Sequence, residues 1–383
     1  MENIKITNKK KGIIKYLILI LILLILLSLC FLYGFIVGAK GIPPFDYLMD
    51  LYKQTKKTEK FETIDSFYLK TDVNSLISIN NEEELVEKRN ALINLVWSNQ
   101  GFPMSKMPEN IEKNIKDERY LDIFNLERID RMTVLMDYGL NSIIYHFHPI
   151  KKNNKLIIYH QGHAGDFING KKTIAYFLDK GFSVLAFSMP LSGMNNQPEI
   201  ELERLGNIKI DSHEKIKFLQ TDQIHPMKFF LEPIAVSLNA VATQYDDIYM
   251  VGISGGGWST TLYSAIDQRI LRSYPVAGSL LIYLRDVWDF GDYEQTLFDV
   301  YQITNYLELY ILGSYGDNRK QIQILNKYDS VFFGIKYQTY EEKIKEKVFK
   351  LGKGEFEVYL DDSHKGHIIS DDVLSLILND IEN

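Results

Sequence analysis

An uncharged stretch of 22 residues, Tyr16 to Val37, constrains this chain of 383 residues more than any other feature. As a helix it is about 33 Å long, which is enough to cross the hydrocarbon core of a bilayer. A run dominated by leucine and isoleucine has no polar face to turn to water, so a buried helix of a soluble core fits it less well. The sequence therefore predicts one transmembrane helix over residues 16–37.

The residues in and around this stretch indicate whether it is cleaved and how it is oriented in the membrane. A cleaved signal peptide would have an apolar run of about 7–15 residues and a site of small residues such as A-x-A. Residues 35–39 offer no such site, and Leu29 before Cys30 is a poor match to a lipoprotein cleavage box. Within fifteen residues on either side, five lysines precede the stretch and one follows it: Lys5, Lys9, Lys10, Lys11 and Lys15, then Lys40. The positive-inside rule predicts a cytoplasmic segment 1–15 and an extracytoplasmic chain after Gly38.

Composition excludes several classes of protein. The 43 basic and 50 acidic residues give a net charge of −7, so no basic excess indicates a nucleic-acid partner. The hydrophobic fraction of 46% predicts a packed core. The single cysteine, Cys30, cannot form an intrachain disulfide or a cysteine-based zinc site. The core must therefore hold the fold together.

The remaining sequence divides near residue 130. Residues 38–130 are predicted to form a stalk and a helical segment, in which Asn81 and the acids after it read as the capped start of an amphipathic helix. Residues 131–383 alternate short β-rich runs with helical ones, which predicts an α/β fold with a mostly parallel central sheet flanked by helices. The predicted strands are Met132–Met136, Ser142–Phe147, Leu156–Tyr159, Ser183–Phe187, Ile248–Ile253, Leu307–Leu312 and Phe356–Leu360, with the first two antiparallel around residues 137–139.

The strongest chemical signal follows the predicted strand Ile248–Ile253. Here the chain reads G-x-S-x-G from Gly252 to Gly256 and continues into a helical run. In that arrangement the serine lies on a tight strand-to-helix turn, where glycines prevent collisions and the hydroxyl is lifted clear of the sheet. Ser254 is therefore the predicted nucleophile.

A serine nucleophile needs a base and an acid that orients the base, in the chain order serine, acid, histidine for this type of fold. Asp317 lies in the loop after the predicted strand over residues 307–313, and Asp329 is a second, less favoured acid. His364 and His367 both follow the last predicted strand and compete for the role of base. Gly366 and the capped helix start at Ser370 favour His367, because a tight turn there would aim its ring back toward the serine.

An acyl-transfer mechanism also needs backbone amides that point at the developing oxyanion. One amide is expected from Gly255, directly after the nucleophile. The second is expected near Gly162 or His163, in the loop that follows the predicted strand Leu156–Tyr159.

With these motifs, the region from Met132 to Leu378 resembles the α/β-hydrolase superfamily, in particular membrane-anchored or secreted esterases related to acetyl xylan esterases and dienelactone hydrolases. The resemblance implies a Ser254, Asp317, His367 triad with an oxyanion hole at Gly255 and Gly162 or His163. It implies a carboxylesterase or deacetylase that works through an acyl-enzyme without a cofactor. The extracytoplasmic location favours an acylated glycan or another envelope ester as substrate.

Three alternatives remain open from sequence: an acyltransferase, a peptidase with the same triad, and a catalytically inactive hydrolase fold that serves as a binding module. The eight histidines raise the question of a metal, since His146 and His148 share a strand face and His160 and His163 lie near Asp166. Their spacing is not a zinc pattern and no H-E-x-x-H run exists, so no metal is expected. The acidic, aromatic segment 285–293 is either a pocket wall or lid, or an ordinary surface loop.

Overall fold

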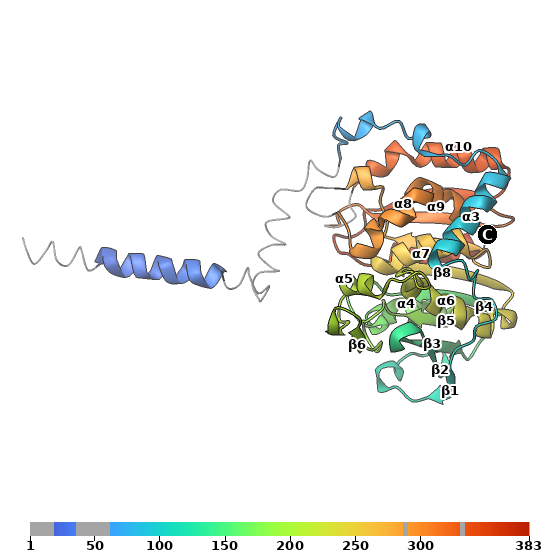
Figure 1. The fold of residues 1–383 in the computed structure, drawn as a ribbon, viewed down its shortest axis with the longest axis horizontal. Helices are drawn as coiled ribbons and strands as arrows, with labels where there is room; N and C mark the ends of the chain where they lie inside the picture. Colours follow the sequence, from blue (N-terminus) through green and yellow to red (C-terminus); the bar gives the residue numbers. More distant parts are fainter. Residues whose placement is uncertain (1–18, 36–61, 286–289, 330–333, 383) are drawn as a thin grey trace, which may run out of the picture. The chain divides into compact units, whose positions relative to one another are not determined.

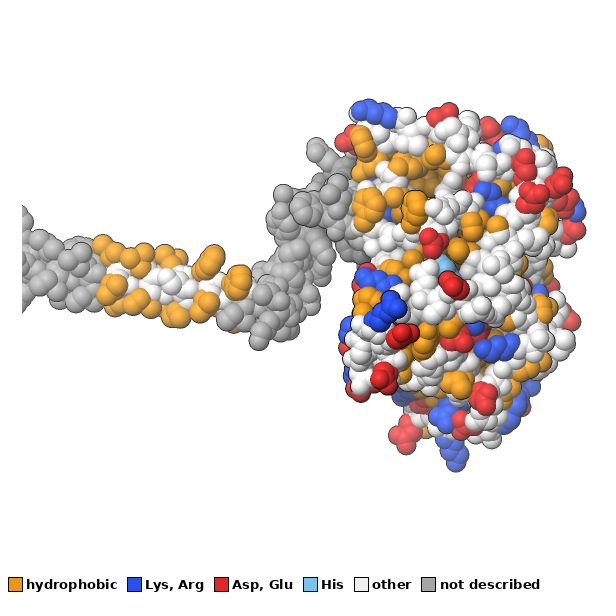
Figure 2. All heavy atoms as spheres, in the orientation of Figure 1, with side chains coloured by type: hydrophobic (Ala, Val, Ile, Leu, Met, Phe, Trp, Pro, Cys, Tyr) orange, Lys and Arg blue, Asp and Glu red, His pale blue; other side chains and the backbone are white. Residues whose placement is uncertain are grey.

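The computed structural model describes residues 19–35, 62–285, 290–329 and 334–382. The chain forms two compact units, Met1–Lys60 and Phe61–Asn383. In the first unit, residues 19–35 are helical and their side chains are all exposed, so that hydrophobic side chains run along the helix in Figure 2. No helix within the described residues combines the length and the apolar character that a bilayer crossing needs. Residues 16–18 and 36–37 of the predicted span lie outside the described part.

The second unit is built around a nine-stranded sheet in the order β1-β2-β3-β5-β4-β8-β9-β10-β11 (Figure 1). The pairs β1–β2, β2–β3 and β3–β5 are antiparallel, and the other five neighbouring pairs are parallel. The strands are β1 (Asn110–Ile115), β2 (Leu126–Leu135), β3 (Asn141–Pro149), β4 (Lys155–His160), β5 (Ser183–Phe187), β8 (Asp247–Ile253), β9 (Arg272–Val276), β10 (Lys320–Asn326) and β11 (Glu355–Asp361). A separate antiparallel pair consists of β6 (Glu199–Leu202) and β7 (Gly206–Lys209).

Helices cover both faces of this sheet. As a result, β5 and β10 are buried along their whole length and β8 along nearly all of it. The helix α7 contacts α3, α6 and α9, and α9 contacts α10. A second group is formed by α4, which contacts β3, β4 and β5, and by α11, which joins α4 through the Lys172–Asp371 ion pair. The helices are α3 (Glu82–Val96), α4 (Lys171–Asp179), α5 (His213–Ile216), α6 (Lys228–Val241), α7 (Gly255–Ile266), α8 (Phe298–Ile303), α9 (Tyr306–Ser314), α10 (Glu341–Leu351) and α11 (Asp371–Glu382).

Most of the predicted elements are confirmed, including the β2–β3 hairpin around Asp137–Gly139 and the helix that Asn81 caps. The side chain of Asn81 accepts a hydrogen bond of 2.9 Å from the Glu84 amide. The sheet, however, begins earlier than the predicted boundary at residues 130/131, since β1 precedes this boundary and β2 spans it. Part of the segment 38–130 therefore belongs to the sheet.

One predicted strand is wrong. The run Leu307–Leu312 lies in the helix α9, which Asn305 caps through the Glu308 amide and whose nine residues are all buried. An apolar run that is buried on all sides has no periodicity to separate a helix from a strand. The strand that occupies this place in the sheet is β10, whose polar residues are buried with partners. Gln321, for example, donates to the hydroxyls of Ser264 and Ser273. This polar composition hid β10 from sequence reasoning.

Candidate active site

Ser254 lies between β8 and α7 on a strained turn. Its backbone has φ 56° and ψ −125°, a conformation that residues other than glycine rarely adopt. The Ser254 amide donates to the Val276 carbonyl at 2.9 Å, which continues the β8–β9 ladder up to the turn. A Cβ on Gly256 would lie 2.0 Å from the His160 carbonyl oxygen, so only glycine fits there. The predicted strand, turn and helix around Ser254 are present.

Three chemically suited residues gather at one edge of the sheet. Strands β8, β9, β10 and β11 are parallel neighbours, so their carboxyl ends lie at the same edge. Ser254 follows β8, Asp329 follows β10 and His367 follows β11. In open α/β sheets this edge is where ligands bind.

His367 is paired with Asp329. The His367 Nδ1 lies 2.5 Å from Oδ2 of Asp329, whose side chain is fully buried. A carboxylate only accepts, so Nδ1 carries a proton, and the neutral form of this imidazole has its lone pair on Nε2, the arrangement that a general base needs. Asn326 at the end of β10 holds the same loop, because its amide donates to the Ile368 carbonyl at 3.1 Å. His367, which the sequence favoured over His364, is thus paired with Asp329, the less favoured of the two acids.

His364 belongs to a different pair. Its Nε2 lies 3.1 Å from Oδ2 of Asp361, and its Nδ1 accepts a hydrogen bond of 3.1 Å from the Gly366 amide. Both ring nitrogens are therefore engaged. Asp361 also accepts hydrogen bonds from Ser363 and Ser370, and Ser370 caps α11 through the Val373 amide. This pair fixes the loop that carries His367.

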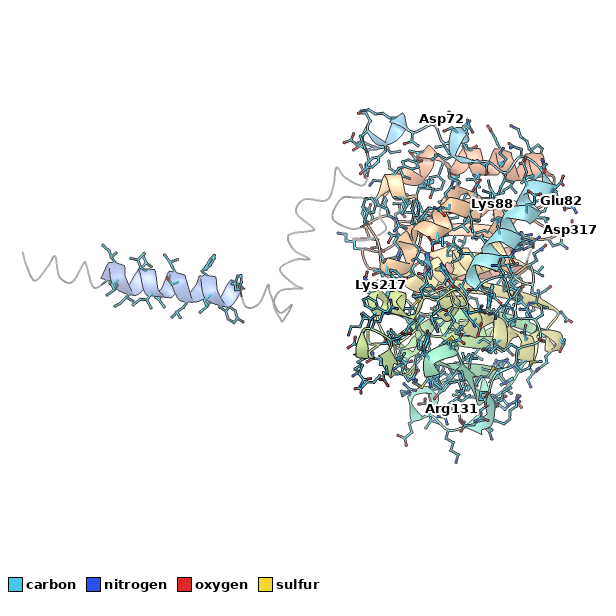
Figure 3. The ribbon with its side chains drawn as sticks, viewed as in Figure 1. Asp72, Glu82, Lys88, Arg131, Lys217 and Asp317 are labelled. Carbon is cyan, nitrogen blue, oxygen red and sulfur yellow. The ribbon has the colours of Figure 1, made fainter. Side chains whose placement is uncertain are left out.

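Asp317, the acid first expected, lies elsewhere. Its side chain is 82% exposed and its ion pair is with Lys353, at 3.8 Å. Figure 3 shows Asp317 at the outer margin of the domain. Because residues 307–313 are helical, Asp317 comes before β10, at the amino end of that strand. It therefore lies at the opposite edge of the sheet from Ser254, and it is not brought to His367.

The residues expected to form the oxyanion hole are adjacent. A Cβ on Gly162 would lie 2.6 Å from the Ser254 Cβ and 3.2 Å from the Gly255 nitrogen. The His163 ring packs on Gly255, where a Cβ would be 2.5 Å from its Cε1 atom. Among the described residues, the amides of Gly162, His163 and Gly255 have no hydrogen-bond acceptor. They are available to an oxyanion beside the serine.

Sequence reasoning missed two residues next to this site, His213 and Glu294. The buried Glu294 carboxylate lies between two imidazoles, with Oε1 2.8 Å from His163 Nε2 and Oε2 3.3 Å from His213 Nδ1. Burial acts to raise the pKa of Glu294, but the two imidazoles outweigh it and hold this pKa at about 2. Burial acts to lower the pKa of His163, but Glu294 and Asp292 raise it above its usual value.

The available signal for Glu294 was its position directly after the acidic, aromatic segment 285–293. The short 3₁₀-helix Tyr293–Thr296 delivers Glu294 to the His163 loop, as a pocket wall would. Residues 286–289 of that segment, including Trp288, lie outside the described residues.

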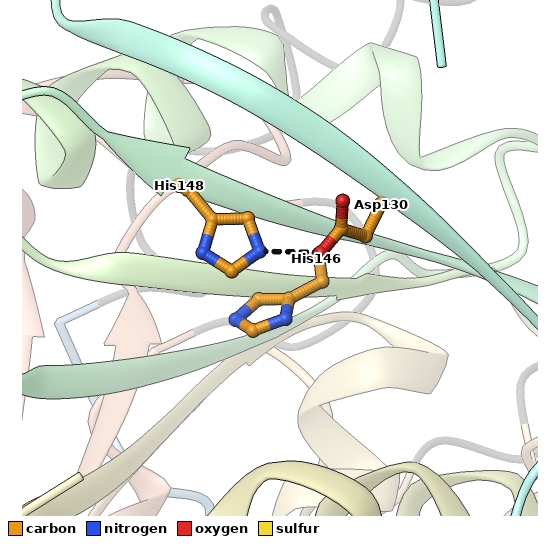
Figure 4. Close-up of side chains that lie close together, drawn as sticks. All are labelled: Asp130, His146 and His148. Atoms are coloured by element: carbon orange, nitrogen blue, oxygen red, sulfur yellow. Dashed lines mark hydrogen bonds and ion pairs between the residues drawn. The ribbon is translucent and has the colours of Figure 1, made fainter. Parts of the chain in front are cut away.

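Asp130, His146 and His148 form a second cluster, on β2 and β3 (Figure 4). His148 Nε2 lies 3.0 Å from Oδ2 of Asp130, and the same carboxylate also binds Lys113 and Arg128. Burial and the Arg128 charge lower the pKa of His148 to about 4, and burial lowers that of His146 well below its usual value. Both imidazoles are neutral near pH 7, and the cations already occupy the carboxylate. The cluster braces the hairpin.

Comparisons with known proteins show the fold. No protein-family model matches the sequence, and no curated protein matches it. An acetyl xylan esterase from Paenibacillus sp. R4 is 14% identical, with a TM-score of 0.52 over 84% of this chain and 99% of that one. An acetyl xylan esterase from Thermoanaerobacterium sp. JW/SL YS485 is also 14% identical, with a TM-score of 0.52 over 83% and 98% of the two chains. A methylesterase is 14% identical, with a TM-score of 0.50 over 83% and 68%. The chain therefore shares the α/β fold of these esterases, with a mostly parallel central sheet flanked by helices.

Proposed function

We propose that this protein is a serine hydrolase of carboxylic esters with Ser254 as nucleophile, His367 as base and Asp329 as the acid that orients the base. The observation that carries the proposal is the strained Ser254 turn at the same sheet edge as the His367–Asp329 pair. Storing strain at a serine between a strand and a helix serves to expose its hydroxyl. The esterase neighbours support the same class of reaction.

In the proposed reaction, Ser254 Oγ attacks the ester carbonyl carbon while His367 Nε2 takes the hydroxyl proton. The oxyanion that forms accepts hydrogen bonds from the Gly255 amide and from the amide of Gly162 or His163. His367 then gives its proton to the departing alcohol, which leaves an acyl-enzyme. Water attacks this intermediate with the same base, releasing the carboxylic acid and restoring Ser254. Asp329 keeps the proton on Nδ1 throughout and stabilises the imidazolium.

The test is the Ser254→Ala variant assayed with p-nitrophenyl acetate. The change removes one hydroxyl from a turn whose shape is set by glycines, so the fold should stay intact and kcat should fall by about 10⁴–10⁶. A fluorophosphonate probe should label the wild-type chain and not the variant. Ser375→Ala, which removes an exposed hydroxyl from α11, is the matched control and should be labelled like wild type. Near-wild-type turnover by a folded Ser254→Ala protein would refute the mechanism.

The same proposal places the hydrolase outside the cytoplasmic membrane, with residues 16–37 as a single-pass anchor and an acylated glycan or other envelope ester as substrate. The uncharged run and the lysines before it support this arrangement. The neighbouring acetyl xylan esterases support an acetylated glycan in particular.

Topology can be tested in intact cells with a membrane-impermeant maleimide after Cys30→Ser removes the native thiol. A cysteine at Lys53 should be labelled and a cysteine at Lys9 should not; the reverse pattern would contradict the orientation. Acetate release from acetylated xylan by the wild-type chain, and not by Ser254→Ala, tests the substrate class.

A further inference from the structure

The His163, His213 and Glu294 side chains form a compact set of possible metal ligands beside the proposed oxyanion hole. One ligand atom from each lies within 4.8 Å of the others. The two imidazole rings are 5.0 Å apart between centroids, and the Glu294 carboxylate lies against both. The His163 ring also packs on Gly255, so this set belongs to the immediate surroundings of Ser254.

The Glu294 oxygen that faces His213 has no hydrogen bond within the described residues. The His213 Nε2 lies 2.9 Å from the Pro190 carbonyl, which only accepts, so Nε2 carries a proton. The His213 Nδ1 lies 3.3 Å from this buried oxygen, Oε2 of Glu294. The tautomer that donates to Pro190 leaves Nδ1 without a proton, so Nδ1 and Oε2 are two electron-pair donors that face each other. A metal ion between them would bind both.

The outer nitrogens of both imidazoles are held in the way that metal-binding histidines require. When a histidine binds a metal through one nitrogen, the other usually donates to a carbonyl or a carboxylate. The Pro190 carbonyl takes this place for His213, and the nearest carboxylate to His163 Nδ1 is that of Asp292, whose Oδ2 lies 3.5 Å away in an ion-pair contact. The two inner nitrogens, Nε2 of His163 and Nδ1 of His213, both face Glu294.

Neighbouring charges separate this set from the Asp130 cluster. Lys113 and Arg128 pair with Asp130 and would repel a metal ion there. Among the described residues, no lysine or arginine forms an ion pair with Glu294, and its charged partners are the two histidines. Arg285, on the same segment, donates to the Leu280 and Phe290 carbonyls and to Gln295.

We propose that His163, His213 and Glu294 bind one Zn²⁺ ion between the two inner imidazole nitrogens and the carboxylate. Two histidines and one glutamate are a ligand set that zinc takes when it keeps a fourth position open. Bound zinc would join the His163 loop to the Tyr293–Thr296 segment and stabilise the folded chain, because an unfolded chain has no such site.

The test uses the full-length chain without a tag, stripped with EDTA and dialysed against Zn²⁺ at micromolar concentrations. Wild type should retain one zinc per chain and unfold at a higher temperature with zinc than with EDTA. Glu294→Gln and His213→Gln should weaken binding by at least about tenfold and lose the thermal shift. Glutamine at position 213 can still donate to the Pro190 carbonyl, and circular dichroism in EDTA shows whether each variant is folded.

His364→Gln is the matched control. It removes a histidine from the His364–Asp361 pair, which is not part of the proposed ligand set, and should leave zinc binding unchanged. Ser254→Ala should also bind zinc like wild type, which separates this test from that of the hydrolase mechanism. The proposal is overturned if wild type retains no zinc, if the Glu294 and His213 variants bind zinc as wild type does, or if His364→Gln lowers binding as much as they do.

Discussion

Two histidines in the loop after β11 each pair with an aspartate, and the two pairs differ in their other contacts. His364 pairs with Asp361 and His367 pairs with Asp329, and both carboxylates are fully buried. His364 uses its second nitrogen to accept the Gly366 amide, whereas no described residue bonds to Nε2 of His367. A general base needs one nitrogen held and the other free, and only His367 meets this condition.

The carboxylates differ as well. Asp361 accepts from Ser363 and Ser370 in addition to His364, so it ties three parts of one loop together. Asp329 reaches that loop from the segment after β10 and pairs with His367. The free ring nitrogen of His367, and not the composition of the pair, therefore distinguishes the proposed base from His364.

The largest difference between the two pairs is expected when each histidine is removed in turn. His367→Ala should lower kcat for p-nitrophenyl acetate by about 10⁴–10⁶, because the serine then has no base. His364→Ala should keep activity within about tenfold of wild type, since it weakens the loop and leaves the base in place. Steady-state kinetics of the two variants decides between them, and the opposite ranking would move the base to His364.

The acids should separate next. Asp329→Asn should lower kcat by about 10⁴, because an asparagine amide can donate to Nδ1 and favour the wrong tautomer. Asp361→Asn should keep kcat within about tenfold. Comparable losses of activity in the two variants would mean that the Asp329 pair has no special part in the reaction.

Asp361 should affect the free energy of unfolding more than it affects activity. Asp361→Asn should lower the free energy of unfolding by about 1–3 kcal/mol near pH 7, because charged hydrogen bonds to Asp361 are lost. Burial acts to raise the pKa of Asp361, but the hydrogen bonds from Ser363 and Ser370 outweigh it and hold this pKa below the usual 3.8. The unfolded chain therefore takes up the proton first as pH falls, and the wild-type advantage should shrink below about pH 4. Urea unfolding from pH 7 to 3 measures it, and a difference that grows in acid would contradict this sign.

The smallest effect is expected at the acid that lies outside the pair. Asp317→Asn should change the free energy of unfolding by less than about 0.5 kcal/mol and activity by less than about twofold, because the side chain is largely exposed and its Lys353 partner is distant. The same two assays serve here. A large loss of activity would restore Asp317 as the acid.

The features of this protein that depend on local patterns could be predicted from its amino-acid sequence. The apolar run Ile248–Ile253 followed by G-x-S-x-G specifies a strand, a strained turn and a helix, whatever surrounds them. Asn81 with its following acids specifies the start of α3, and residues 137–139 specify the β2–β3 turn. Gly366 and Ser370 likewise indicated the loop that carries His367.

The partner of His367 and the groups around Ser254 could be identified only from the folded chain. The strand β10 is recognisable only after Gln321 and Gln323 find buried partners, and that assignment makes Asp329, and not Asp317, the aspartate that lies beside His367. His213 and Glu294 are 81 residues apart in the sequence and meet His163 only through the packing of separate segments. Hydrogen bonds and charge pairs between distant segments leave no periodic pattern in the sequence, so their partners are known only once the chain is folded.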